Sequence, residues 1–295
     1  MSLLETIKEK VLLSDGAMGT QLQEAGLSAG ECGDAWNLEY PDRVLAIQKA
    51  YVDAGSDCIT TNTFGACRLA LRRHGWEEKV AELNQAAVQI ARDAFGDRPG
   101  LVLGDVGPFG GLMEPYGDTS QEEVLSAYIE QIEALVKAGV DAIIIETQTS
   151  LEEMGMALMA AREAGSPCTI GSMSFDVTYD GSDVRTMMGV TPEQAAESIQ
   201  QDGAHLVATN CGTGVDARWA AKILHRYRTV CDLPLMAQPN AGKPELVGDQ
   251  VIYKETPQEM AEALKALIEA DARIIGACCG STPDHLAALR KELDR

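Results

Sequence analysis

The sequence predicts an α/β fold, a (β/α)8 TIM barrel that forms a single domain over residues 1–295. Eight apolar, β-rich runs recur along the chain, and segments of helical period lie between them. No low-complexity linker or break in composition divides the 295 residues. Eight βα units suit a barrel, whose usual size is about 250 residues. A doubly wound sheet is the alternative, because strand order cannot be read from a sequence.

The predicted strands are short runs rich in Val, Ile, Leu and Thr. Several of them, such as residues 141–147, are apolar almost throughout, as strands buried on both faces of a parallel sheet should be. In chain order the eight runs are residues 11–15, 58–63, 101–106, 141–147, 168–175, 205–211, 233–239 and 273–279.

The predicted helices carry apolar residues at every third or fourth position. Four of the five clearest segments end on glycine, which is a common helix stop. These segments are residues 41–55, 121–139, 150–165, 191–203 and 256–271.

Composition excludes several classes of partner. Lys and Arg total 24 against 45 for Asp and Glu, and the net charge of -21 argues against nucleic acid or an anionic membrane. Residues 1–10 lack the features of a secretory signal, and no apolar stretch is long enough to span a bilayer. We therefore expect a cytoplasmic protein whose eight cysteines are reduced, rather than a disulfide framework.

In a (β/α)8 barrel the active site lies where the strands end, and three cysteines fall at such ends. Cys211 ends the sixth predicted strand, and Cys278 and Cys279 end the eighth. Adjacent side chains of a regular strand point in opposite directions, so the Cys-Cys pair requires a turn of the backbone. Gly276 and Gly280 bracket the pair and would permit that turn.

Three thiolates with an open fourth position describe a catalytic zinc site, and soft sulfur ligands favour zinc over magnesium or calcium. The alternative is that these cysteines are small apolar residues placed by packing. We interpret the other five as core or surface residues. The four histidines form no metal-binding motif, and we interpret them as packing or surface residues.

Acidic residues also stand at strand ends, and two of them are candidate substrate contacts. Asp15 begins the glycine-rich run of residues 15–20, whose backbone N–H groups could cradle a carboxylate while Asp15 binds a cationic amine. A tight turn with no ligand is the alternative, and the run fits neither common nucleotide-binding motif. Glu146 ends a run of isoleucines, so its charge needs a donor or a cation. Either a structural hydrogen bond or the ammonium group of an amino acid satisfies that need.

Taken together, these strand ends resemble the homocysteine S-methyltransferase family, over about residues 8–293. The most specific part is Asn210-Cys211 followed some 65 residues later by the run GACCGSTP at residues 276–283. The run PNAGKP at residues 239–244 is most similar to the homocysteine-binding module of cobalamin-dependent methionine synthase. Residues 171–189 depart from the form expected of that module, on the side that would face the methyl donor.

The resemblance implies that residues 1–295 form a homocysteine-binding methyltransferase domain. It implies zinc on Cys211, Cys278 and Cys279, with the homocysteine sulfur in the fourth position. It also gives roles to four residues of the amino-acid site and one residue near the metal. Asp15 and Glu146 would hold the amino group, the amides of Gly16 and Ala17 would receive the carboxylate, and Asn240 would ligate the metal when substrate is absent.

The expected reaction is methyl transfer to the thiol of homocysteine, which gives methionine. The thiolate is the nucleophile, and coordination to zinc would favour it at neutral pH. No corrinoid-binding module is recognised, so we expect methylcobalamin to be supplied by a separate corrinoid protein or module. The alternatives are a small donor (S-methylmethionine, S-adenosylmethionine or betaine), another thiol acceptor, or a noncatalytic zinc-binding subunit.

Overall fold

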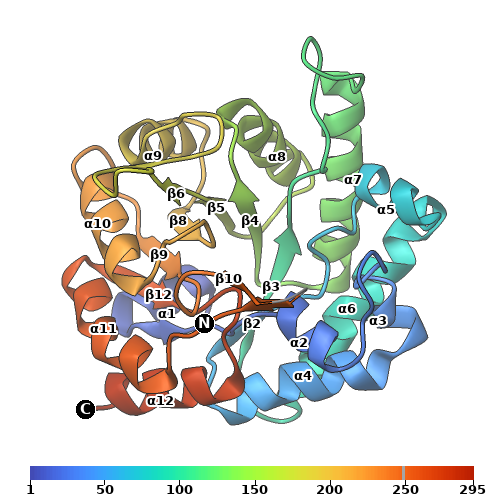
Figure 1. Cartoon of the computed structure of the whole chain (residues 1–295). Coiled ribbons are helices and arrows are strands. Elements are labelled where there is room, and N and C mark those ends of the chain that lie inside the picture. Colours follow the sequence, from blue (N-terminus) through green and yellow to red (C-terminus); the bar gives the residue numbers. More distant parts are fainter. Residues whose placement is uncertain (248–249) are drawn as a thin grey trace.

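The computed structural model describes residues 1–247 and 250–295, and it confirms the (β/α)8 barrel. Eight parallel strands form one sheet in the order β1-β12-β9-β8-β5-β4-β3-β2, inside a ring of helices (Figure 1). The predicted span of 1–295 includes residues 248 and 249, which lie outside the described residues. The strands are β1 Leu12–Leu13, β2 Cys58–Thr60, β3 Leu101–Val106, β4 Ala142–Gln148, β5 Thr169–Met173, β8 Leu206–Asn210, β9 Leu235–Gln238 and β12 Ala272–Ile275.

Asp57 is the main link between β1 and β2, where the barrel closes. Its backbone N–H donates to the carbonyl of Leu13 at 2.7 Å, and its carboxylate accepts the backbone N–H of Leu13 at 2.9 Å. Lys10 and Arg290 form ion pairs with the same carboxylate at 2.6 and 3.0 Å. The partly buried carboxylate of Asp57 thus accepts the Leu13 N–H, which a backbone carbonyl of β2 would accept in a longer β-ladder.

The eight outer helices each follow one strand. Several of them begin with a capping box, for example at Ser120, Thr191 and Thr256, whose side chains satisfy backbone N–H groups that a helix start leaves free. The outer helices are α4 Pro41–Asp53, α6 Val80–Phe95, α7 Gln121–Ala138, α8 Leu151–Glu163, α9 Pro192–Gln201, α10 Ala217–Arg228, α11 Pro257–Glu269 and α12 Pro283–Leu293. Shorter helices are α1 Leu3–Glu9, α2 Gly19–Glu24, α3 Trp36–Glu39 and α5 Arg68–Leu71, with 3-10 turns η1 Arg72–His74 and η2 Glu77–Lys79.

All five predicted helices are present, and the four predicted glycine stops have a backbone reason. Gly55, Gly139, Gly165 and Gly203 have φ values of 106°, 91°, 72° and 86°. A side chain at these angles would clash with the following carbonyl, so glycine ends the helix at little cost.

The apolar core has two layers. Between strands and helices lies the larger cluster, which includes Val102 and Val106 of β3. Inside the barrel lies a smaller cluster, which includes Leu103 of the same strand and is closed at the amino-terminal end by Leu3 and Ile7 of α1. Alternate residues of each strand therefore face the axis and the helices in turn.

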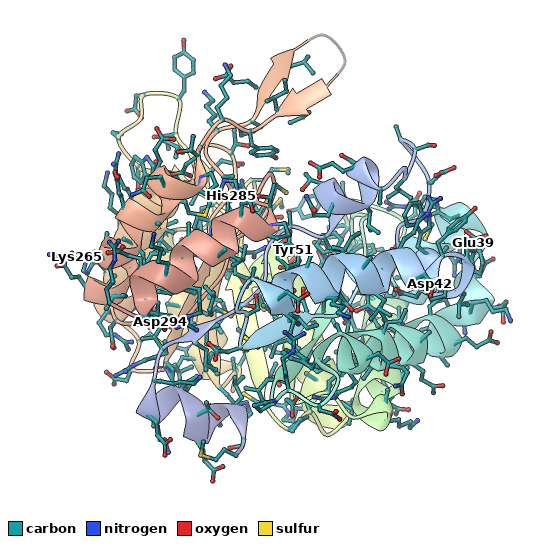
Figure 2. The ribbon with its side chains drawn as sticks, turned by 90° about the horizontal axis from the view of Figure 1, so that it is seen from below. Glu39, Asp42, Tyr51, Lys265, His285 and Asp294 are labelled. Carbon is teal, nitrogen blue, oxygen red and sulfur yellow. The ribbon has the colours of Figure 1, made fainter. Side chains whose placement is uncertain are left out.

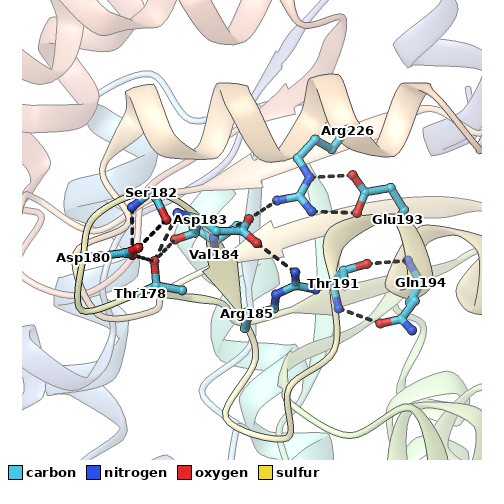
Figure 3. Close-up of polar contacts among 10 residues, drawn as sticks. All are labelled: Thr178, Asp180, Ser182, Asp183, Val184, Arg185, Thr191, Glu193, Gln194 and Arg226. Carbon is cyan, nitrogen blue, oxygen red and sulfur yellow. Dashed lines mark hydrogen bonds and ion pairs between the residues drawn. The ribbon is translucent and has the colours of Figure 1, made fainter.

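Two hairpins extend the loops at the carboxyl ends of the strands. β6 Asp176–Val177 pairs with β7 Val184–Arg185 after β5, and β10 Glu245–Val247 pairs with β11 Gln250–Ile252 after β9. The first hairpin lies in the divergent segment 171–189. Arg226 of α10 fixes it by binding both Asp183 of the hairpin and Glu193 of α9 (Figure 3).

No helix in the described part of the chain is both long enough and apolar enough to cross a membrane.

Candidate active site

The interior of the barrel becomes polar one layer above its apolar core. The core residues of the eight strands at this level are Leu12, Cys58, Leu103, Ile144, Ile170, Ala208, Met236 and Ile274. Residues two positions apart on a strand point the same way, so the next layer also faces the axis. That layer consists of Ser14, Thr60, Asp105, Glu146, Ser172, Asn210, Gln238 and Gly276. Every one is polar or glycine, and together they form the floor of the site.

The three predicted cysteines lie together at this end of the barrel. The Sγ atoms of Cys211 and Cys279 are 3.8 Å apart, those of Cys278 and Cys279 are 3.9 Å apart, and all three lie within 4.8 Å of one another. A tetrahedral zinc ion with Zn–S bonds of about 2.3 Å holds its sulfur ligands about 3.8 Å apart. Two of the three sulfur separations therefore match those of a tetrahedral zinc site.

The loop after β9 holds the two cysteine loops together. The N–H groups of Cys211 and Cys278 donate to the carbonyls of Gln238 and Pro239 at 3.1 and 2.8 Å, and Ala241 donates to Cys279 at 3.0 Å. Because β9 lies between β8 and β12 in the sheet, cysteines that are distant in sequence meet across one strand.

The turn at the Cys-Cys pair depends on the two flanking glycines for different reasons. Gly280 has a φ of 78°, and a Cβ there would lie 2.1 Å from Cγ of Tyr253. Gly276 instead allows the backbone directly after β1 to lie close, because a Cβ at Gly276 would be 2.9 Å from the carbonyl oxygen of Asp15.

The three thiols also alter one another's acidity. Hydrogen bonds from Cys211 and Cys278 lower the pKa of Cys279 to about 3. The hydrogen bonds that Cys278 makes to Cys211 and, to a smaller extent, to Cys279 raise the pKa of Cys278 well above its usual range. The cluster thus favours a thiolate, which is the form of cysteine that binds metals.

A cavity of about 350 Å³ opens beside the cysteines. Its walls include all three cysteines and the predicted residues Gly16, Ala17 and Glu146. A cavity of this size with a few convergent polar groups is typical of a small-molecule site.

Asp15 lies behind the wall of this cavity. It is buried, and it accepts the N–H and the hydroxyl of Thr60 at 2.7 and 3.0 Å and the hydroxyl of Ser14 at 3.2 Å. Burial raises its pKa to about 6, against the opposing effect of the Thr60 hydrogen bonds. These bonds fix the turn after β1.

The Ala17 amide, for which the resemblance implied contact with a carboxylate, bonds within the protein. It donates to the hydroxyl of Ser281 at 3.0 Å, and that hydroxyl donates to the carbonyl of Cys278 at 2.8 Å. Tyr51 of α4 donates to the carbonyl of Ala17 at 2.7 Å. Figure 2 shows Tyr51 at the end of α4 that faces the start of α12. The turn at Gly16 and the cysteine loop therefore form one hydrogen-bonded unit.

Glu146 reaches the cavity from the end of β4. Its carboxylate accepts the side-chain amide of Asn210 at 3.1 Å, and Asn210 in turn accepts the N–H of Thr147 at 2.9 Å. Thr147 has a φ of 59°, so the strand turns sharply directly after Glu146. Burial, followed by the charge of Cys211, raises the pKa of Glu146 to about 8.

Asn240 connects the loop after β9 to the loop that carries Cys211. Its side-chain amide donates to the carbonyl of Gly212 at 2.9 Å. Its Oδ1 atom is buried and has no hydrogen-bond partner among the described residues. A role for this oxygen at the metal stays a prediction.

The family model that describes homocysteine S-methyltransferase matches residues 12–293. The chain belongs to this family. It is 32% identical to a methionine synthase of Mycobacterium leprae (strain TN) over 317 aligned residues and 31% identical to one of Mycobacterium tuberculosis (strain ATCC 25618 / H37Rv) over 296. These alignments cover 99% and 96% of the chain but 25% of each relative, so the chain spans about a quarter of their length.

The metallated form of the homocysteine methyltransferase MmuM from Escherichia coli has the same fold. It aligns over 98% of both chains with a TM-score of 0.77 and 23% identity, and the oxidized form aligns with a TM-score of 0.76.

Among the polar residues that the sequence did not predict for the site, two have unpaired oxygens. Asp105 and Gln238 line the cavity, and each has a buried side-chain oxygen without a partner among the described residues. The signal was the strand period, because both stand two positions beyond an apolar residue of the barrel interior, Leu103 and Met236.

The interpretation of His285 as a packing residue agrees with its contacts. The ring lies at the start of α12 (Figure 2), where Nδ1 contacts Thr282 at 2.9 Å and Nε2 contacts the carbonyl of Glu255 at 2.9 Å.

Proposed function

We propose that this chain transfers a methyl group to the thiol of homocysteine, giving methionine, and that residues 1–295 form one homocysteine-binding domain. The observation that carries the proposal is the cluster of three cysteine sulfurs on the wall of an acidic cavity. Membership of the homocysteine S-methyltransferase family supports it.

Cys211, Cys278 and Cys279 would hold a zinc ion, whose spacing requirement their sulfurs meet. Zinc bound there would supply a fourth position in which the homocysteine sulfur is kept as a reactive thiolate at neutral pH. The cluster lies at the end of the barrel where enzymes of this fold place their catalytic groups.

The protein groups around the cavity would position the rest of the substrate. Glu146 points its carboxylate into the cavity and would accept the substrate ammonium, and Asp15 would add its charge from directly behind the wall. The amides of Gly16 and Ala17 would receive the carboxylate, and the bond from Ala17 to Ser281 would then be exchanged for one to the substrate. Fixing both ends of the amino acid would orient its sulfur and remove much of the entropic cost of reaction.

We propose methylcobalamin, carried by a separate corrinoid protein or module, as the methyl donor. Two observations support this choice: the relatives named methionine synthase are about four times as long as the aligned chain, and residues 239–244 resemble the methionine synthase module. We also propose a cytoplasmic location, because all eight cysteines are free thiols.

The test combines zinc content with demethylation of methylcobalamin in the presence of homocysteine. Cys211, Cys278 and Cys279 are each changed to Ala, and Cys231→Ala serves as the matched control because Cys231 is a buried thiol outside the cluster. We expect about one zinc ion per chain in the parent and the control. Each of the three site variants should lose both zinc and activity.

Zinc retained in all three site variants would overturn the metal assignment. Activity with S-methylmethionine, S-adenosylmethionine or betaine in place of methylcobalamin would replace the donor. Inactivity with every donor and homocysteine, in a chain that holds zinc, would indicate another thiol acceptor or a noncatalytic zinc-binding subunit.

A further inference from the structure

Asp105 places an unpaired carboxylate oxygen on the wall of the cavity. The residue is 6% exposed, it lines the cavity, and its Oδ1 atom has no hydrogen-bond partner among the described residues. Buried polar atoms in native proteins nearly always have a partner, because an unpaired one costs free energy. An unpaired oxygen on a cavity wall therefore points to a ligand that supplies the missing donor.

The backbone prevents Asp105 from turning away from the cavity. Its N–H donates to the hydroxyl of Thr61 at 3.0 Å, and its carbonyl accepts the hydroxyl of Thr63 at 2.7 Å and the amide of Gln131 at 3.3 Å. Both backbone groups are thus fixed. The side chain points along the same direction as Leu103, toward the barrel axis.

The charge around the cavity indicates which ligand group this oxygen receives. The lining residues include three carboxylates, Asp34, Asp105 and Glu146, but none of those described is Lys, Arg or His. Asp34 already accepts the N–H of Gly65 at 3.0 Å, and Glu146 accepts Asn210 at 3.1 Å. Burial and the charge of Glu146 raise the pKa of Asp105 well above its usual range, which means that its ionised form lacks a compensating charge in the cavity. A cation beside Asp105 would supply that charge.

We propose that Asp105 binds the ammonium group of the amino-acid substrate, together with Glu146 and Asp15, and makes the cavity selective for thiols that carry an α-amino group. This inference rests on the proposed function, because it concerns the same cavity. The competing explanation is that Asp105 is a neutral acid that shares a proton with Glu146 and has no contact with the substrate.

The test compares two ligands that differ only in the ammonium group. L-Homocysteine and 4-mercaptobutanoate share the thiol, the carboxylate and the chain length. Their affinities for the zinc-loaded full chain are measured by calorimetry in the parent and in Asp105→Asn, which keeps the shape of the side chain and removes its charge. Zinc content is measured in the same samples.

We expect Asp105→Asn to weaken binding of L-homocysteine by about 10- to 100-fold, the usual value of a hydrogen bond to a charged group. Binding of 4-mercaptobutanoate should stay unchanged or become tighter, because a negative charge near its carboxylate is removed. Equal changes for both ligands, or no change for homocysteine, would overturn the inference.

Two further measurements keep the test decisive. If Asp105→Asn fails to fold, Asp105→Ser removes the same charge with a smaller side chain. A structure of the unmodified protein with homocysteine should place the ammonium nitrogen about 2.7–3.2 Å from Oδ1 of Asp105, and a longer separation would contradict the role. A parent chain that binds zinc but not homocysteine would instead overturn the proposed function itself.

Discussion

The tightest steric constraint at the metal cluster lies at Gly212, directly after Cys211. Gly212 has a φ of 89°, and a Cβ there would lie 1.8 Å from the backbone carbonyl oxygen of Phe175. An ordinary carbon–oxygen contact is about 3.3 Å, so Gly212→Ala would force the two backbone segments apart by roughly 1.5 Å. Neither segment is free to move, because Cys211 and Gly212 bond to Gln238 and Asn240, and the Phe175 ring is fully buried.

We expect Gly212→Ala to lower both the free energy of unfolding and the affinity for zinc. The left-handed backbone costs about 1–2 kcal/mol for a residue with a side chain, and overpacking adds about 1–3 kcal/mol. A shift of this size also moves Sγ of Cys211 away from the other two sulfurs, which stand at the separation that zinc requires. Affinity for zinc should fall by at least about 10-fold, as it does when groups that support a metal ligand are lost.

Gly203→Ala is the matched control for this change. Gly203 has a similar φ of 86°, but a Cβ there would meet no neighbouring atom within 4 Å. The control should therefore lose only the backbone contribution, about 1–2 kcal/mol, and keep its zinc. Urea unfolding of the metal-free proteins and chelator competition for zinc measure the two effects. Equal stability and equal zinc affinity in the two variants would refute the steric argument.

Two further predictions concern the substrate and the hairpin. Glu146→Gln should weaken homocysteine binding by about 10- to 100-fold while sparing zinc, and unchanged affinity in a calorimetric titration would defeat its role. Arg226→Met should lower the free energy of unfolding by about 1 kcal/mol at pH 7, since the Arg226 ion pairs are partly exposed. Because Arg226 lowers the pKa of Glu193 from 4.5 to about 2, this contribution is present above pH 4.5 and lost as pH falls toward 2. A difference between parent and variant that stays constant from pH 7 to pH 3 would show that the ion pair is not its source.

The fold could be predicted because two sequence features agreed along the whole chain: the hydrophobic period of the strands and helices, and the loops and glycine stops between them. The predictions failed mainly at the carboxyl ends of strands. The run 58–63 has strand composition, yet β2 ends at Thr60. Thr61 still donates its N–H to the carbonyl of Leu103 at 2.9 Å, but the N–H of Thr63 turns back to the carbonyl of Thr61 at 2.9 Å instead of pairing with β3. Likewise β12 ends at Ile275, before the Cys-Cys pair. Residues that leave the ladder to build a site keep the composition of a strand, so sequence alone overextends them.

The cysteine cluster could be predicted because parallel strands bring their carboxyl ends to one edge, whatever their order. The state of the Ala17 amide could not be predicted. It depends on Ser281, which is 264 positions away, and no local pattern reports such a contact. Asp105 was not predicted as a site residue, although the sequence contained a signal for it. Asp105 stands two positions after Leu103, and the alternation of side chains along a strand directs both toward the barrel axis.

The position of the sulfur cluster relative to the carboxylates has a consequence for substrate choice under the proposed function. Glu146 and Asp105 extend from β4 and β3, and the loop after β9 joins the cysteine loops, so both groups are fixed by the same barrel. Under the proposed function, a shorter thiol such as cysteine has one methylene fewer with which to span the metal position and the carboxylates. Losing one methylene contact costs only about 0.8 kcal/mol, whereas losing a hydrogen bond to a charged group costs about 1.5–3 kcal/mol. Selection for homocysteine would therefore come from the fixed spacing of the two charged groups, and only weakly from apolar contact with its chain.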